Sequence, residues 1–153
     1  MSADADGELH RAQGVEANNS AWELLGRDDL TEDEGEDLLR RVYAAAYHWT
    51  RAASRGPENE ARAEYMIAKA HWRLGQTDAA LHHADRCRRA TEAAGLGDFD
   101  LAYALEVRAR ALTLAGRDDE AAAAWTAARA VPIADPEDRA IVDADFADAP
   151  PSA

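Results

Sequence analysis

Alanine makes up about a quarter of this 153-residue chain, and no other feature restricts its fold as strongly. The β-branched residues Val, Ile and Thr together number only 14. Because alanine favours helix and β-branched residues favour strand, this balance predicts an all-α fold. Alanine buries little surface, so we expect the helices to pack closely against one another. The length suits a single domain.

The net charge of −13, from 30 acidic and 17 basic residues, restricts the partners of the chain. Nucleic acid and anionic membranes both select basic surfaces, so we expect neither as a partner. The segment 1–14 lacks the basic and apolar regions of a signal peptide. No apolar run approaches the roughly 18 residues of a membrane span. These features predict a cytoplasmic protein.

Glycine, proline and capping residues divide the chain into seven expected helices joined by short connections. Capping-box spacing occurs twice, at Ser20 with Glu23 and at Thr31 with Glu34. The expected helices cover residues 20–25, 31–54, 58–74, 77–94, 98–115, 118–130 and 136–147.

The two ends of the chain lack a periodic apolar face. We therefore expect a flexible acidic arm over residues 1–14 and a flexible tail over residues 148–153. Residues 15–147 are predicted to form one helical domain.

An internal repeat relates residues 61–90 to residues 102–131. Gly75 corresponds to Gly116 in this alignment, and small residues recur at matching positions. The matched small residues are Ala68 and Ala109, Ala80 and Ala121, and Cys87 and Ala128.

This pattern resembles the tetratricopeptide repeat (TPR), a helix–turn–helix unit with small residues at its packing points. Trp125 matches the aromatic residue of the second helix of that unit. Glu64 and Arg108 depart from the pattern, because large apolar residues usually stand there, and Ala84 replaces an aromatic residue. The spacing from Gly75 to Gly116 also exceeds the usual repeat length of about 34 residues.

The resemblance implies a short right-handed α-solenoid of antiparallel helix hairpins, with about seven helices. It extends to small uncharacterised bacterial TPR-like proteins and brings no activity with it. The clearest repeats cover residues 58–94 and 99–131.

In TPR proteins the first helix of each pair lines a concave groove, so the resemblance assigns eight residues to a groove here. Four are cations and three are aromatic, a combination that suits a carboxylate or an acidic peptide. The alternative is internal pairing, because Glu106 and Arg110 are spaced i,i+4. The expected binding residues are Arg62, Tyr65, Lys69, Trp72, Arg73, Tyr103, Glu106 and Arg110.

Signatures of catalysis are missing from the sequence. The chain has no nucleophile elbow and no glycine-rich phosphate loop. No two histidines are spaced i,i+3 or i,i+4, so a zinc site would require separate helices to converge. Cys87, the single cysteine, falls at a packing point and is predicted to lie in the core. We therefore expect no enzymatic activity, no cofactor and no metal.

Aromatic residues in the first two expected helices allow two interpretations. They can seal these helices onto the repeats, or they can form the wall of a small-ligand pocket in which His48 supplies a polar group. The residues are Trp22, Tyr43, Tyr47, His48 and Trp49.

Two functions follow from these observations. The first is an adaptor or scaffold that binds a peptide or protein segment of acidic character in a locally basic and aromatic groove. The alternative is a sensor or carrier of a small anionic ligand, with its pocket between the aromatic helices and the repeats.

Overall fold

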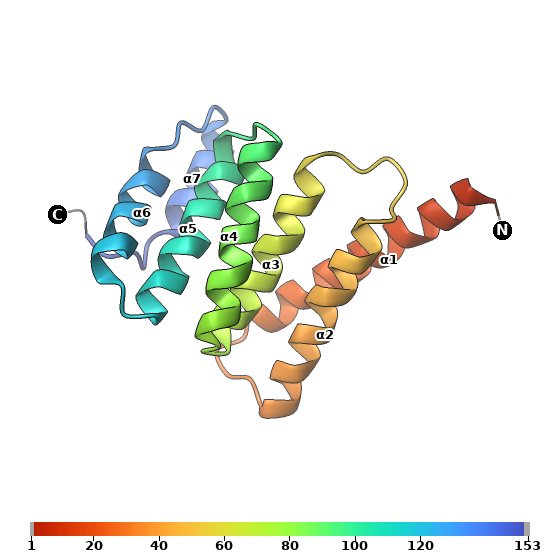
Figure 1. Ribbon diagram of the computed structural model, residues 1–153, viewed down its shortest axis with the longest axis horizontal. Coiled ribbons are helices and arrows are strands. Elements are labelled where there is room, and N and C mark those ends of the chain that lie inside the picture. The colour runs from red at the N-terminus through yellow and green to blue at the C-terminus, as the bar shows by residue number, and fades with distance from the viewer. Residues whose placement is uncertain (1, 152–153) are drawn as a thin grey trace.

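A computed structural model describes residues 2–151, which form seven helices and no strand (Figure 1). The all-helical class and the number of helices expected from the sequence are confirmed. Among these residues, none of the helices combines the length and apolar character needed to cross a membrane. The helices are α1 (Ala3–Leu25), α2 (Glu32–Trp49), α3 (Glu58–Arg73), α4 (Thr77–Ala93), α5 (Asp98–Leu114), α6 (Asp118–Ala130) and α7 (Pro136–Asp145).

Three of the helix ends use a glycine in the left-handed region. Gly75, Gly95 and Gly116 have φ angles of 71°, 65° and 73°. Glycine adopts this conformation without the steric cost that a side chain brings. The amide after Gly75 and the amide after Gly116 each donate to the carbonyl five positions earlier, at 2.9 Å in both turns. The two turns that the sequence repeat aligns therefore have the same hydrogen bonding.

The start of α2 confirms one of the two predicted capping boxes. The Thr31 hydroxyl accepts from the Glu34 amide, and the Glu34 carboxylate accepts from the Thr31 amide, each at 3.1 Å. The second predicted box is wrong, because the Ser20 hydroxyl donates to the Ala17 carbonyl within α1. The helix expected to start there begins much earlier in the chain, at Ala3.

The first half of α1 replaces the flexible arm expected over residues 1–14, which is wrong from Ala3 onward. A Cβ at Gly7 would lie 3.0 Å from the Cβ of Ala53, and one at Gly14 would lie 3.2 Å from the Trp49 ring. The helix therefore packs through its glycines, which leave no periodic apolar pattern in the sequence. In Figure 1 this half of α1 extends to the right, beyond the other helices.

Helix α5 lies at the centre of the packing. It contacts α3, α4, α6 and α7, while α3 also contacts α2, α4 and α1. The side chain of alanine is small, so helices that meet at alanines can pack with their backbones close together. The fully buried alanines of α5 are Ala102, Ala104, Ala109 and Ala111.

The segment after α7 also packs on the domain, which corrects the flexible tail expected over residues 148–153. Asp148 pairs with the guanidinium of Arg110, and Ala149 packs against the core around α5 and α6. Residues 152–153 of that prediction lie outside the described residues. The partner of Asp148 stands 38 positions earlier, so a local sequence pattern does not indicate this contact.

Candidate functional site

Three of the eight predicted binding residues meet in an ion cluster around the buried carboxylate of Glu106. The Lys69 ammonium lies 2.7 Å from Oε1 of Glu106, and the Arg110 guanidinium donates to the same oxygen. Arg110 also holds both carboxylate oxygens of Asp148, each at 2.8 Å. These four residues, called the ion cluster below, connect α3, α5 and the segment after α7. The internal pairing of Glu106 with Arg110 that their spacing allowed is confirmed.

Two tryptophan rings cover the ion cluster. The Arg110 guanidinium lies 5.0 Å from the ring centres of both Trp72 and Trp125, and the Lys69 ammonium lies 4.9 Å from Trp72. Burial would lower the pKa of Arg110, but Asp148 and Glu106 outweigh it, so the pKa is raised. The hydrogen bonds from Arg110 in turn lower the pKa of Asp148. Arg110 and Asp148 therefore stay charged, and each neutralises the other within the protein.

The other two predicted cations are also occupied within the protein. Arg62 pairs with Asp100 through two hydrogen bonds of 2.9 and 3.1 Å. Arg73 donates to the carbonyls of Arg27 and Asp28, in the loop between α1 and α2. All four predicted cations therefore have partners within the protein, as the alternative of internal pairing requires. The acidic excess of the chain supplies carboxylates for three of them, and loop carbonyls supply the fourth.

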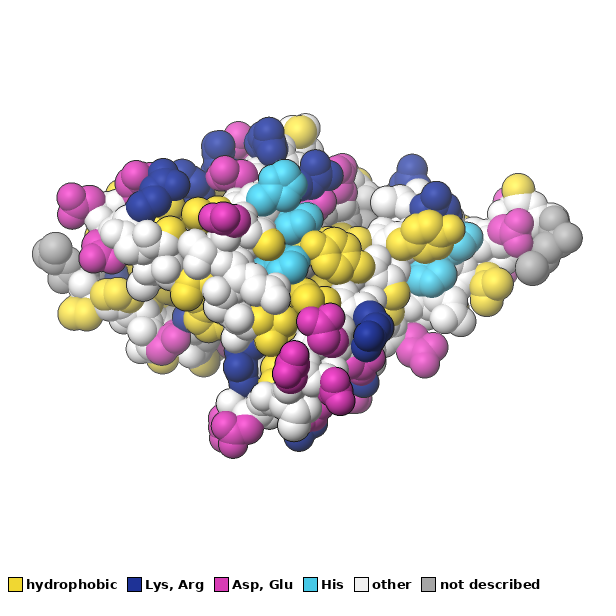
Figure 2. Space-filling view, turned by 60° about the horizontal axis from the view of Figure 1, so that its bottom comes forward, with side chains coloured by type: hydrophobic (Ala, Val, Ile, Leu, Met, Phe, Trp, Pro, Cys, Tyr) yellow, Lys and Arg dark blue, Asp and Glu magenta, His cyan; other side chains and the backbone are white. Residues whose placement is uncertain are grey.

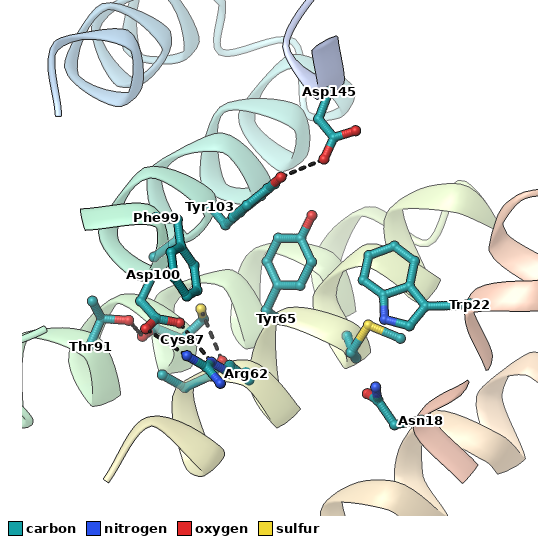
Figure 3. Close-up of a pocket in the computed structure, with 13 residues that line it drawn as sticks. Asn18, Trp22, Arg62, Tyr65, Cys87, Thr91, Phe99, Asp100, Tyr103 and Asp145 are labelled. Carbon is teal, nitrogen blue, oxygen red and sulfur yellow. Dashed lines mark hydrogen bonds and ion pairs between the residues drawn. The ribbon is translucent and has the colours of Figure 1, made fainter. Parts of the chain in front are cut away.

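The remaining predicted residues, Tyr65 and Tyr103, line a pocket of about 280 Å³ between α1, α3, α5 and α7 (Figure 3). Trp22 of α1 and Asp145 of α7 complete its wall, and neither was a predicted groove residue. Both come from helices that are remote from α3 and α5 in the sequence. We call this cavity the aromatic pocket; its wall also includes Asn18, Arg62, Phe99 and Asp100.

The rings of the aromatic pocket contact one another. Tyr65 stands between Tyr103 and Trp22 (Figure 3), with ring centres 5.6 Å from Tyr103 and 6.4 Å from Trp22. The Tyr103 hydroxyl donates to the Asp145 carboxylate. Burial and then Asp145 raise the pKa of Tyr103, while burial and then Glu106 raise the pKa of Tyr65. Both hydroxyls therefore stay protonated near neutral pH.

The aromatic residues of the first two helices serve different purposes. Trp22 reaches the aromatic pocket, as the ligand-pocket interpretation requires. Trp49 packs on α1 at Gly14, as the sealing interpretation requires. The Nδ1 atom of His48 lies 2.8 Å from Nδ1 of His10, on the α1–α2 side of the molecule. His48 is therefore absent from the pocket that it was expected to serve.

A hydrogen-bonded group of Tyr43, His71 and His83 has no local sequence signal, because its members come from three helices. The Tyr43 hydroxyl lies 2.8 Å from Nε2 of His71 and 3.1 Å from Nε2 of His83. Nδ1 of His83 lies 2.7 Å from the Glu64 carboxylate. Figure 2 shows histidine side chains gathered on one face beside hydrophobic ones. Within residues 2–151, no three His, Cys, Asp or Glu side chains are placed to hold a metal ion.

Cys87 lies in the core, as predicted. Its side chain is buried and its thiol donates to the Ala61 carbonyl at 3.3 Å. Burial raises the pKa of this thiol to about 12. The thiolate is the reactive form of cysteine, and the raised pKa keeps the Cys87 thiol protonated near neutral pH. Cys87 is therefore a packing residue, at the back of the aromatic pocket.

Comparison of the chain with protein-family models, with curated proteins and with solved structures finds no match.

Proposed function

We propose that this protein is a TPR-like adaptor or scaffold of the bacterial cytoplasm, without enzymatic activity, that holds a peptide or protein segment across α3 and α5. The observation that carries the proposal is the aromatic pocket, because a concave apolar site with a few polar groups is the usual form of a binding site. It lies on the two helices to which the repeat pattern assigned the binding residues.

Two features support the TPR-like arrangement, a right-handed solenoid of antiparallel hairpins. Helix α3 packs against both α4 and α5, so the first helices of the two repeats contact each other. The turns at Gly75 and Gly116 have the same hydrogen bonding. The charged residues that depart from the family pattern have partners: Glu64 pairs with Arg86, and Arg108 pairs with Asp85.

The size of the aromatic pocket restricts what it can hold. Its volume of about 280 Å³ lies just below the range of about 300–1,000 Å³ for ligand pockets. Trp22 and Asn18 of α1 close one side of it. The pocket therefore suits one side chain of a bound segment, with the rest of the segment lying across the surface around it.

A small molecule is the second candidate for the same pocket. The pocket lies between Trp22 of the first helix and the two repeat helices, where a sensor or carrier would place its ligand. In that case the whole ligand is no larger than a side chain or a small head group.

Peptide selection from a random displayed library, followed by affinity measurement, tests the proposal. We expect Trp22→Ala to weaken binding of the selected peptides by about tenfold or more, which corresponds to about 1.4 kcal/mol. The matched control is Tyr47→Ala, because Tyr47 is a similarly exposed aromatic residue on α2 that does not line the pocket. Peptides that bind Trp22→Ala as tightly as the unmodified protein would place the binding face elsewhere.

Native mass spectrometry distinguishes the second candidate. A mass adduct that the purified protein retains and the Trp22→Ala variant loses supports a small-molecule carrier. Selected peptides that depend on Trp22, together with the absence of such an adduct, support the adaptor.

A further inference from the structure

The aromatic pocket carries one carboxylate without a cationic partner. Arg62 and Asp100 neutralise each other at its edge. Asp145 forms no salt bridge within residues 2–151, and its carboxylate accepts a hydrogen bond from the Tyr103 hydroxyl. The side chains of the wall therefore leave a net negative charge at the opening of the pocket.

The rings of the pocket add to this negative character. The face of an aromatic ring carries partial negative charge, so rings attract ammonium and guanidinium groups. The fold already uses this contact elsewhere, with Arg110 between two tryptophans and Arg51 4.0 Å from the Tyr47 ring centre. Two rings of the pocket already have a cation of the protein over them, since Lys69 lies 5.9 Å from the Tyr65 ring centre and Arg62 lies 5.3 Å from the Phe99 ring centre. Among the described residues, no lysine or arginine lies over the rings of Trp22 or Tyr103, so these two rings are open to a cation from outside.

The cations nearest to Asp145 are paired with other carboxylates. Arg110 donates to the backbone carbonyl of Asp145 at 3.2 Å and forms its salt bridges with Glu106 and Asp148. Lys69 and Arg110 belong to the ion cluster, where Glu106 and Asp148 hold them. An anionic ligand would face the Asp145 carboxylate without a free cation to compensate. The electrostatics of the pocket are therefore the reverse of those expected from the sequence.

We propose that the aromatic pocket recognises an organic cation, the guanidinium or ammonium group of a basic side chain or of a small amine. The proposal rests on the proposed function, because it takes this pocket as the binding site. Trp22 and Tyr103 contact the face of the cation, Tyr65 contacts its apolar stem, and Asp145 accepts its N–H groups. The Tyr103 hydroxyl acts as a positioning group, since it orients the Asp145 carboxylate.

Capped single amino acids test the charge preference of the pocket even though its natural partner is unidentified. The probes are N-acetyl-arginine amide, its neutral isostere N-acetyl-citrulline amide, and N-acetyl-glutamate amide. Binding is followed by NMR through the Trp22 indole signal. We expect the arginine probe to bind about tenfold or more tightly than the citrulline probe, and the glutamate probe to bind more weakly still.

Two variants of α7 separate a local contact from the overall field of the protein. Asp145→Asn and Asp143→Asn each remove one negative charge, and Asp143 is paired with Arg139 outside the pocket. We expect Asp145→Asn to remove the preference for arginine over citrulline and Asp143→Asn to preserve it. Equal losses in both variants would mean that the net charge attracts the probe, and they would overturn the proposal.

The remaining outcomes separate this inference from the proposed function. Equal binding of arginine and citrulline probes, or tighter binding of the glutamate probe, overturns the cation proposal and leaves the pocket as a binding site. If no probe perturbs Trp22 and the peptides of the library are also indifferent to Trp22→Ala, both proposals fail. Butylammonium identifies the source: binding as tight as that of the arginine probe indicates a small amine, and weaker binding indicates a basic peptide side chain.

Discussion

At the scale of single residues, Glu106 determines the electrostatics of the interior. Its side chain is only 1% exposed, and its Oε1 atom receives both Lys69 and Arg110. Burying charges is costly unless they are paired, so each cation depends on this carboxylate. One acidic residue therefore turns two predicted ligand-binding cations into structural ones.

We expect Glu106→Gln to lower the free energy of unfolding by about 3 kcal/mol or more, because Lys69 loses its carboxylate partner and the buried Arg110 keeps only the exposed Asp148. Urea unfolding followed by tryptophan fluorescence measures the change. Glu120→Gln is the matched control, since Glu120 pairs with Arg117 on the exposed surface, and it should leave the unfolding midpoint unchanged. Equally small effects of both substitutions would contradict the ion cluster.

His71 makes stability depend on pH. Burial lowers the pKa of His71 in the folded state below its ordinary value of about 6.5. The unfolded chain therefore binds more protons in this range. The stabilisation is complete above about pH 6.5 and is lost as the pH falls toward the folded-state pKa.

Urea unfolding midpoints at about pH 7.5 and about pH 5.5 test this linkage. The midpoint of the unmodified protein should fall at the lower pH, and His71→Gln should reduce that fall. His48 contributes in the same direction, because burial lowers its pKa too, so the dependence is reduced rather than removed. His82→Gln, at an exposed position, is the control, and a loss of pH dependence equal to that of His71→Gln would contradict the assignment.

At the scale of helices, glycine has two different structural roles in this chain. Gly75 and Gly116 end helices, and their positions allowed the sequence to predict the bounds of α3 and α5 closely. Gly7 and Gly14 lie inside α1 and form its contact with the α2 side of the molecule. A glycine that follows an apolar-periodic segment indicates the end of a helix. A glycine inside a helix interrupts that periodicity, which is why α1 was expected to begin so late.

Gly14→Leu tests whether α1 packs as a helix. The added side chain would meet the Trp49 ring, so we expect a loss of about 1–3 kcal/mol in the free energy of unfolding. Gln13→Leu places the same side chain on the exposed side of α1 and is expected to have little effect. If both variants unfold at the same temperature, the first half of α1 does not pack on Trp49.

The candidate site was predictable to the extent that it lies on repeated helices. Tyr65 and Tyr103, which the sequence predicted to face one groove, both line the aromatic pocket, because helical spacing determines which side of α3 or α5 a residue occupies. Trp22 and Asp145 were not assigned to the groove, since only the tertiary arrangement brings α1 and α7 to it. Arg73 was misplaced because its partners are carbonyls of a distant loop, and backbone acceptors leave no signal in residue types.

At the scale of the whole molecule, the end of the described chain completes the core. Phe146 is buried between the rings of Tyr103 and Trp125, with ring centres 5.7 and 5.6 Å away. It connects the aromatic pocket to the core of α5 and α6. The end of α7 therefore stabilises both the fold and the site.

Phe146→Ala should lower the free energy of unfolding by about 3–5 kcal/mol, the usual cost of removing a buried phenylalanine. Ile141→Ala removes a side chain of α7 that is 56% exposed, and its effect should stay within about 0.5 kcal/mol. Thermal unfolding followed by circular dichroism measures both. An equally small shift for the two variants would show that α7 is not part of the cooperative unit.

The ion cluster also gives the chain a chemical reporter. Lys69 is the only lysine in the sequence, and the structure holds its amine against Glu106 beneath Trp72. The Lys69 side chain is only 16% exposed and its ammonium is paired, so an amine-directed label reacts with it slowly in the closed structure and faster when α3 and α5 separate. One modified peptide in a digest would therefore measure how often the two repeats come apart, without an engineered probe.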